Sequence, residues 1–426
     1  MRNILKSALR LSTTTTAKDL YWMFSGNLIS IILAFVATII IARYITQAEY
    51  GIYLALFTWS TLIAELADFG INTSLSIFFP KLLKQEKFNE VKIIYATAFK
   101  LELMVGILVM LISYLSLPLI RQTIFIDIGR ILLVITVIET FFIQLTSFAV
   151  MTQAAYQKFK EFAYVTVFFG FSRLVLILIF WYFGKITLIN ILLIQLASSI
   201  LNVLFAQALT KFPLKIKEFK LSIVKEIFKY SGFMGVTKIF SAITNRLDLL
   251  MLLPLAGATA TGVYGAASRI AQIYPFLVTG FGQVIAPKMA TFENGREAAP
   301  FLKKSILITF LFLLTIIIFY LFAQPIILLL FGATYLESIG VFRNLLLALT
   351  GYILSVPFTT LLVYTYKKPQ LLTVMVFIQL IIIGVGNMIL IPRFGYLGPT
   401  YSLTLANAAL LVLSGGISWY FITKEK

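Results

Sequence analysis

The chain has 426 residues, of which 60% are hydrophobic and only 12% charged, and its formal net charge is +18. Soluble domains are about half apolar and a quarter charged, so this composition excludes a water-soluble fold and leaves the lipid bilayer as the solvent. The sequence contains no Cys and no His, which excludes disulfides, thiolate or imidazole metal sites and Cys/His catalysis.

Long apolar runs determine the predicted fold class. In hydrocarbon every backbone polar group must be bonded within the chain, so only helices or a closed barrel can span it. Barrel strands alternate in polarity, whereas the runs here are continuous over the roughly 20 residues that a helix needs. The chain is therefore predicted to be an all-α integral membrane protein. Its twelve predicted transmembrane helices lie at 20–43, 52–79, 93–117, 131–153, 162–183, 187–210, 232–255, 260–286, 304–323, 338–364, 370–391 and 398–421.

Three further segments flank or interrupt these helices. Residues 1–19 are basic and loosely amphipathic, and they lack the apolar stretch and cleavage site of a signal peptide. Residues 324–331 are apolar but short, so we expect them to lie at the membrane interface. Residues 211–231 are the most basic segment and are predicted to form an amphipathic linker on the inner membrane surface.

The distribution of Lys and Arg predicts the orientation. With the N-terminus inside, 24 of the 35 basic residues fall in segments on the cytoplasmic side and 5 in segments on the opposite side. This bias predicts a multi-pass protein of the cytoplasmic (inner) membrane with both termini in the cytoplasm. The positive charge is then attracted to anionic membrane lipids. We expect no nucleic-acid partner, because the charges are scattered over seven short segments.

A weak internal repeat divides the helices into two sets of six. Gly51 and Gly262 lie in matching Gly-Ile/Val-Tyr motifs 211 residues apart, and the same offset relates Gly184 to Gly395. Six helices per half give both halves the same orientation, which is a parallel repeat. The predicted organisation is an N-terminal six-helix lobe at 1–210, the linker at 211–231 and a C-terminal six-helix lobe at 232–426.

Ionisable residues within predicted helices are costly in a bilayer, so each needs a role. On helix 7, a polar stripe is predicted from the spacing of Lys238, Ser241, Asn245 and Asp248. Arg246 and Arg269 are expected at similar depth on helices 7 and 8. Two guanidinium groups there would form a positive patch suited to phosphate or carboxylate.

The remaining membrane charges have alternative interpretations. Glu65 and Asp68 on helix 2 are either a proton or cation site or partners for Lys238. Arg173 on helix 5 is either functional or a buried structural partner of Glu139 on helix 4. Near helix ends, Lys100 and Arg343 are expected to reach the headgroups.

Signals for catalysis are lacking in the sequence. It has no phosphate-binding P-loop, no nucleophile-elbow motif and no cluster of metal ligands, and its longest loop is about twenty residues, which is short for a donor-sugar site. The chain is therefore predicted not to be an enzyme, with no catalytic residues, no metal site and no cofactor.

Four segments carry a family resemblance. They are ARYITQAEYGIYLAL, LADFGINTSLSIFFPK, NRLDLLMLLPLAGATATGVYGAASRI and IPRFGYLGPTYS. With the six-plus-six plan, they make the sequence resemble the MOP exporter superfamily (multidrug/oligosaccharidyl-lipid/polysaccharide), and within it the Wzx-type polysaccharide flippases. Pro399 departs from the pattern, since a small residue is expected there.

The resemblance implies two six-helix lobes around a central cavity lined by helices 1, 2, 7 and 8, with alternating access. The implied cargo is a polyprenyl-pyrophosphate-linked oligosaccharide. On this hypothesis Arg246, Arg269, Lys238 and Asn245 bind the headgroup, and Asp248, Glu65 and Asp68 are candidates for coupling to H⁺ or Na⁺. A polysaccharide polymerase and glycosyltransferases are the expected functional partners.

Two other functions compete with this one. A cation-coupled multidrug exporter of the same superfamily would favour acidic rather than basic cavity residues. A membrane-embedded polymerase or ligase would need a large extracytoplasmic loop, and the longest is about 15 residues.

Overall fold

The structure is a computed structural model that describes residues 15–210, 223 and 237–425. The N-terminal residues 1–14 and nearly all of the predicted basic linker at 211–231 lie outside the described residues. Every regular element in the described part of the chain is helical.

The first half of the chain contains eight described helices. They are α2 (Thr15–Tyr44), α3 (Gln47–Ala67), α4 (Ile71–Lys84), α5 (Phe88–Leu115), α6 (Leu117–Thr123), α7 (Arg130–Ala155), α8 (Phe159–Tyr182) and α9 (Leu188–Thr210).

The second half begins with helical residues 237–244. The elements that follow are α11 (Leu247–Ala271), α12 (Ile273–Met289), α13 (Gly295–Leu321), α14 (Ala323–Phe331), η1 (Ala333–Tyr335), α15 (Ser338–Thr360), the π-helical η2 (Leu361–Thr365), α16 (Pro369–Phe394), η3 (Gly395–Leu397) and α17 (Gly398–Lys424). The apolar segment predicted to be interfacial is thus the nine-residue helix α14.

Ten helical segments in the described residues are long and apolar enough to cross a bilayer. Two of them, Thr237–Met289 and Pro369–Lys424, contain 53 and 56 residues. One crossing needs about 20 residues, so each of these segments is long enough for two. Each also contains a glycine with positive φ, Gly257 at 85° and Gly395 at 55°, where the chain leaves helical geometry. The ten segments therefore provide twelve crossings, as predicted.

The described chain forms two compact units. Of the described residues, unit 1 comprises 15–44, 59–121, 127–210 and 223, and unit 2 comprises 45–58, 122–126 and 237–425. Each unit exposes large apolar side chains, such as Leu204 (61% exposed) in unit 1 and Val412 (71%) in unit 2. Exposure of such apolar surfaces to water costs free energy, whereas exposure to the hydrocarbon of a bilayer does not.

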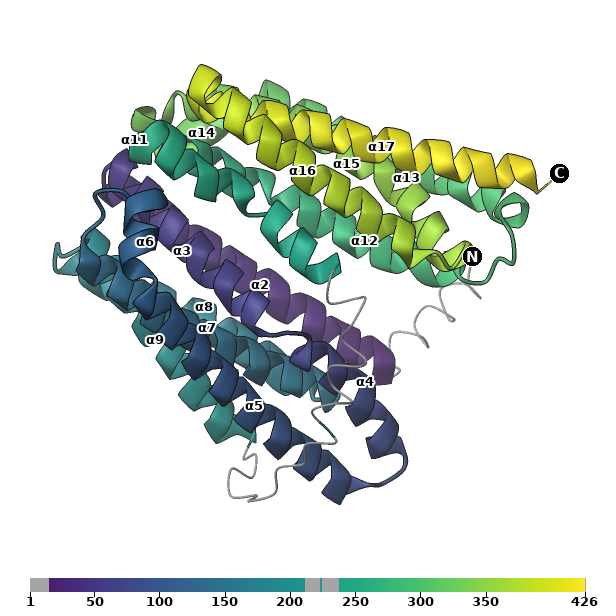
Figure 1. The fold of residues 1–426 in the computed structure, drawn as a ribbon, viewed down its shortest axis with the longest axis horizontal. Helices are drawn as coiled ribbons and strands as arrows, with labels where there is room; N and C mark the ends of the chain where they lie inside the picture. Colours follow the sequence, from purple (N-terminus) through teal and green to yellow (C-terminus); the bar gives the residue numbers. More distant parts are fainter. Residues whose placement is uncertain (1–14, 211–222, 224–236, 426) are drawn as a thin grey trace, which may run out of the picture. The chain divides into compact units, whose positions relative to one another are not determined.

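Small residues set the close packing in unit 1. In Figure 1 the purple helix α2 lies alongside α8, and a Cβ added to Gly26 of α2 would lie only 2.7 Å from Cβ of Ala163 on α8. From the other side, a Cβ on Gly170 of α8 would lie 3.2 Å from Cβ of Leu33. Glycines at both ends of the contact therefore let the two backbones approach, as is common between membrane helices.

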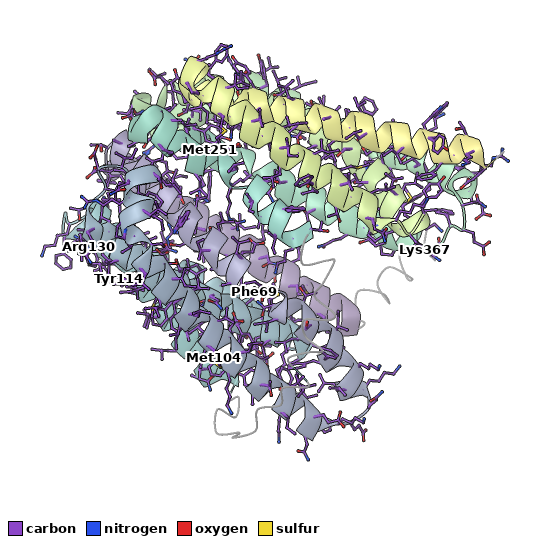
Figure 2. The ribbon with its side chains drawn as sticks, viewed as in Figure 1. Phe69, Met104, Tyr114, Arg130, Met251 and Lys367 are labelled. Carbon is purple, nitrogen blue, oxygen red and sulfur yellow. The ribbon has the colours of Figure 1, made fainter. Side chains whose placement is uncertain are left out.

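The predicted helix 52–79 is broken in the structure, which corrects the expectation of one continuous helix. α3 ends at Ala67, and α4 begins at Ile71. Between them Phe69 and Gly70 have φ of 42° and 82°, which L-residues rarely adopt within a helix. Phe69 lies at this break in Figure 2 and is half-exposed.

Close glycine contacts also organise unit 2. The yellow helix α17 lies along α16 in Figure 1, where a Cβ on Gly386 would lie 2.8 Å from the Ser402 hydroxyl oxygen. Pro399, the departure from the family pattern, is in the first turn of α17. A proline is tolerated there because that N–H has no partner within the helix.

The repeat-related glycines contact each other within unit 2. A Cβ on Gly51 of α3 would overlap the carbonyl oxygen of Ala258 and would lie 2.7 Å from the backbone nitrogen of Gly262. A Cβ on Gly262 would in turn overlap the carbonyl oxygen of Gln47. These are backbone atoms that cannot rotate away, so both positions require glycine.

Candidate functional site

The predicted site residues are distributed over both units. Unit 1 contains Glu65 on α3 and Asp68 at the α3–α4 break. Unit 2 contains Lys238, Asn245, Arg246, Asp248 and Arg269. Each set is described within its own unit.

The predicted polar stripe on helix 7 is interrupted. The helical residues 237–244 end before Asn245, and α11 begins at Leu247. The Arg246 N–H bonds to the carbonyl of Ile243, three residues back, instead of four. Asp248 therefore belongs to a different helix from Lys238, and Asn245 lies in the turn between the two helices, so the four residues do not share one continuous face.

Asp248 is held by two neutral side chains. The Tyr264 hydroxyl donates to its Oδ2 at 2.7 Å, and the Asn387 amide donates to its Oδ1 at 3.0 Å. Tyr264 lies on the second part of α11 and Asn387 on α16, so the cluster ties three helical segments together. Such bonds to an ionised acceptor are among the stronger hydrogen bonds in proteins.

Asn387 has an unusual environment. Its side chain is fully buried, and its Oδ1 has no hydrogen-bond partner in the described structure. A buried acceptor without a donor is costly, so its presence next to a carboxylate calls for an explanation. Carboxylate, amide and hydroxyl oxygens are ligands that Na⁺ uses, and a carboxylate can also carry a proton.

Neither Tyr264 nor Asn387 was selected from the sequence. Asn387 is one of three amides in the strongly apolar helix α16, and a polar residue in such a helix is a signal that could have been followed. Tyr264 is the tyrosine of the Gly-Val-Tyr repeat motif, which was interpreted only as evidence of duplication.

Arg246 directly precedes α11 and Arg269 lies in its last turn, and the two arginines are at similar levels along the helix axis. This helix reverses direction at Gly257, and Asp248 contacts Tyr264 across the reversal. Because Asp248 lies opposite Tyr264, Arg246, two residues before Asp248, lies opposite about residue 266, two residues after Tyr264. Residue 266 is three positions from Arg269. At 1.5 Å per residue the offset along the axis is about 5 Å.

Their immediate surroundings differ. Arg269 stacks over the Phe57 ring at 5.5 Å, and its buried Nε has no hydrogen-bond partner in the described structure. Arg246 donates from Nη1 to the carbonyl of Ala242 at 3.2 Å. An arginine with unused donors, stacked on an aromatic ring, is suited to receive a phosphate or carboxylate.

In unit 1 the acidic candidates have clear structural contacts. Oδ1 of Asp68 accepts the backbone N–H of Asn72 at 3.0 Å, which places a carboxylate at the start of α4. Glu65 is half-buried on α3.

Glu139 and Arg173 are both buried and interact electrostatically, which supports the structural interpretation of that pair. In the described residues no group of three or more acidic side chains could hold a metal ion.

Residues 16–293 match the family described as "Polysaccharide biosynthesis protein". This range covers well over half of the chain. The chain belongs to the polysaccharide biosynthesis protein family. A search of curated protein sequences found no match.

Solved structures with the same fold belong to one superfamily. An inward-facing multidrug resistance MATE family transporter of the MOP superfamily matches with a TM-score of 0.75 and 14% identity, over 93% of this chain and 95% of that one. The lipid II flippase MurJ, in an inward closed conformation, matches with a TM-score of 0.74 and 15% identity, over 93% and 87%. A MOP superfamily transporter from Pyrococcus furiosus matches at 0.60 and 14%, over 93% and 96%.

At these identities the structural matches show the fold. The predicted twelve-helix, two-lobe membrane fold is confirmed, and so is the predicted membership of the MOP superfamily on its polysaccharide branch.

Proposed function

We propose that this polysaccharide biosynthesis family member is a transporter that flips a polyprenyl-pyrophosphate-linked oligosaccharide across the cytoplasmic membrane by alternating access, and that it is not an enzyme. The family match supports the polysaccharide cargo, and MurJ, described as a lipid II flippase, has a similar fold. The Lys and Arg distribution supports cytoplasmic termini. Glycosyltransferases would supply the cargo, and a polymerase would consume it.

The observation that carries this proposal is the pair formed by Arg246, at the start of α11, and Arg269, in its last turn. Both are half-buried in a membrane segment, and Arg269 keeps a buried donor without a protein acceptor. A guanidinium group in this state favours an anionic ligand, and the pyrophosphate is the anionic part of the proposed cargo. Lys238 and Asn245 are the further headgroup candidates.

Coupling to H⁺ or Na⁺ is proposed at Asp248. The support is the cluster of Asp248, Tyr264 and the unpartnered oxygen of Asn387, which is neutral apart from the carboxylate. Glu65 is retained as a second candidate. Asp68 is the weakest of the three, because its carboxylate is already bonded to the start of α4.

The arginines can be tested in proteoliposomes that contain a fluorescent undecaprenyl-pyrophosphate oligosaccharide. Arg246→Gln and Arg269→Gln are each expected to slow flipping about tenfold or more, because each removes a charge-assisted contact. Arg343→Gln is the matched control, since Arg343 is another arginine in a membrane helix, stacked on Tyr320. Flipping at the wild-type rate in both arginine variants would refute the site.

A multidrug exporter is the alternative function within the same fold. A multidrug exporter would transport a cationic dye outward. Substitution of Asp248 would abolish this transport, and substitution of Arg246 or Arg269 would leave it unchanged.

A further inference from the structure

Unit 2 contains a pocket that the arginine and Asp248 sites do not explain. It has a volume of 380 Å³, at the lower end of the roughly 300–1,000 Å³ of small-molecule sites. Its walls are residues 237–245, α12, α15, η2, α16 and α17. Of the eighteen lining residues in the described part of the chain, twelve carry a hydroxyl or amide, and all eighteen are uncharged. This is an unusual lining for a membrane helix bundle, where polar groups are costly.

Many of the hydroxyl groups in the lining have already used their protons. Thr244 donates to the carbonyl of Phe240, Ser355 to that of Tyr352 and Thr360 to that of Val356, each at 2.7 Å. Each of these oxygens keeps its acceptor lone pairs. The pocket wall is therefore rich in hydrogen-bond acceptors.

Amide groups complete the lining. Gln379 is buried and donates to Oδ1 of Asn407 at 3.1 Å, which fixes its orientation and leaves its own carbonyl oxygen as a further acceptor. Asn245 and Gln283 are exposed and provide both donors and acceptors.

This lining selects one chemical class of ligand. A pyrophosphate offers only acceptors and needs cationic partners, which the pocket lacks. An organic cation would need a carboxylate, and the pocket lacks that as well. A polyprenyl chain would leave the free acceptor oxygens of the lining without donors. A neutral group with many hydroxyl donors satisfies the acceptors, and a sugar ring is such a group.

The position of the pocket connects it to the arginines. Asn245 lines the pocket, and Arg246 is the next residue, so their Cα atoms are about 3.8 Å apart. A ligand that carries a sugar directly on a pyrophosphate could therefore engage both positions. We propose that this pocket binds the pyrophosphate-proximal sugar of the cargo, while Arg246 contacts the phosphate. The proposal rests on the proposed flippase function.

Two glycines on α12 provide a matched test. Gly282 lines the pocket, and a Cβ there would meet only Cγ1 of Val356 at an ordinary 3.7 Å. Gly282→Leu should thus fill the pocket without a backbone clash. Gly280 lies on the same helix outside the pocket lining, and a Cβ there meets nothing within 4 Å. Gly280→Leu is the control for an added leucine on this helix.

The measurement compares lipids with and without sugar. Full-length protein in nanodiscs is titrated with undecaprenyl pyrophosphate and with undecaprenyl pyrophosphate that bears N-acetylglucosamine, N-acetylgalactosamine or galactose, and binding is read by native mass spectrometry. We expect wild type and Gly280→Leu to bind at least one sugar-bearing lipid about tenfold more tightly than the bare lipid. Gly282→Leu should bind all four lipids equally and the bare lipid as tightly as wild type.

The outcomes separate this inference from the proposed function. If the bare lipid binds and depends on Arg246, but Gly282→Leu keeps the sugar preference or wild type has none, the pocket assignment is wrong and the flippase proposal stands. If neither kind of lipid binds, both are overturned. A thermal unfolding midpoint for Gly282→Leu within a few degrees of that of Gly280→Leu confirms that the pocket variant is folded.

Discussion

Replacement of Asn387 by leucine is the sharpest test of the Asp248 cluster. Leucine has the same branching and number of side-chain heavy atoms as asparagine, so Asn387→Leu removes the amide while it keeps the shape of the side chain. The substitution deletes the 3.0 Å bond to Oδ1 of Asp248 and also the buried amide oxygen beside it. The Tyr264 bond to Oδ2 remains.

The expected magnitude follows from the type of bond. A hydrogen bond to a charged group contributes about 1.5–3 kcal/mol, and each 1.4 kcal/mol is a factor of ten in affinity. If Na⁺ binds here, Asn387→Leu should weaken it roughly 10- to 150-fold, because the ion loses a ligand oxygen. If the coupling ion is a proton, the substitution should tighten its binding instead, because the ionised carboxylate loses a donor.

The assay uses the stabilisation of the folded protein by a bound ion. The thermal unfolding midpoint of purified protein is measured against Na⁺, with choline replacing it, and separately against pH. The midpoint rises with the logarithm of ligand concentration above Kd, so a change in affinity moves the onset along the concentration axis.

Asn407→Leu is the matched control. Asn407 is also a buried amide of unit 2, but it bonds to Gln379 and to the carbonyl of Ala348 at 2.9 Å, away from any carboxylate in the described contacts. Asn407→Leu should lower the unfolding midpoint at every ion concentration without changing the concentration at which the midpoint begins to rise. The reasoning is refuted if both variants move the onset equally, or if wild type responds to neither ion.

Two further predictions concern stability. Gly51→Ala should lower the free energy of unfolding by about 1–3 kcal/mol, because its Cβ would lie 2.7 Å from the Gly262 nitrogen. At Gly340 an added Cβ would meet nothing within 4 Å, so Gly340→Ala should be neutral or stabilising by up to about 1 kcal/mol. Equal thermal midpoints for these two variants in detergent would contradict the steric argument. Glu425 accepts the backbone N–H groups that begin α13, at 3.1 and 3.2 Å, so Glu425→Gln should lower the free energy of unfolding by about 0.3–1 kcal/mol. Amide hydrogen exchange should become faster in the first turn of α13 alone. Unchanged exchange there would count against this prediction.

The sequence was sufficient for the helices because hydropathy over 20 residues is a local property. The predicted ranges 131–153 and 370–391 differ from α7 and α16 by only a few residues at either end. The short helix α14 was also anticipated, since its nine residues cannot span the bilayer.

Breaks within apolar segments could not be predicted in the same way. Hydropathy averaged over about 20 residues does not locate the point at which the backbone leaves the helix, here at Phe69 and Gly70. The same holds at Asn245 and Arg246, where the predicted stripe is interrupted. At the first break a local bond, from the Asn72 N–H to Asp68, starts the new helix, and an average of hydropathy does not detect such a bond.

Partners in the candidate site depend on contacts that are distant in the chain. Asp248 was selected because a charge in a membrane helix needs a reason, but its partner Asn387 lies 139 residues away. A spacing rule on one helix cannot find such a contact. The structure gives Asp248 two neutral donors, Tyr264 and Asn387.

The contact between Gly51 and Gly262 has a consequence for the origin of the fold. These residues are counterparts in the internal repeat, and each meets the backbone beside the other. A contact between a residue and its own counterpart is isologous, the kind that forms between identical subunits in a two-fold dimer. In a dimer of a single six-helix ancestor, one codon would have encoded the glycine on both sides of this contact. Any side chain at that position would then have clashed in both subunits. After gene duplication the two codons could vary separately, yet in this chain both still encode glycine.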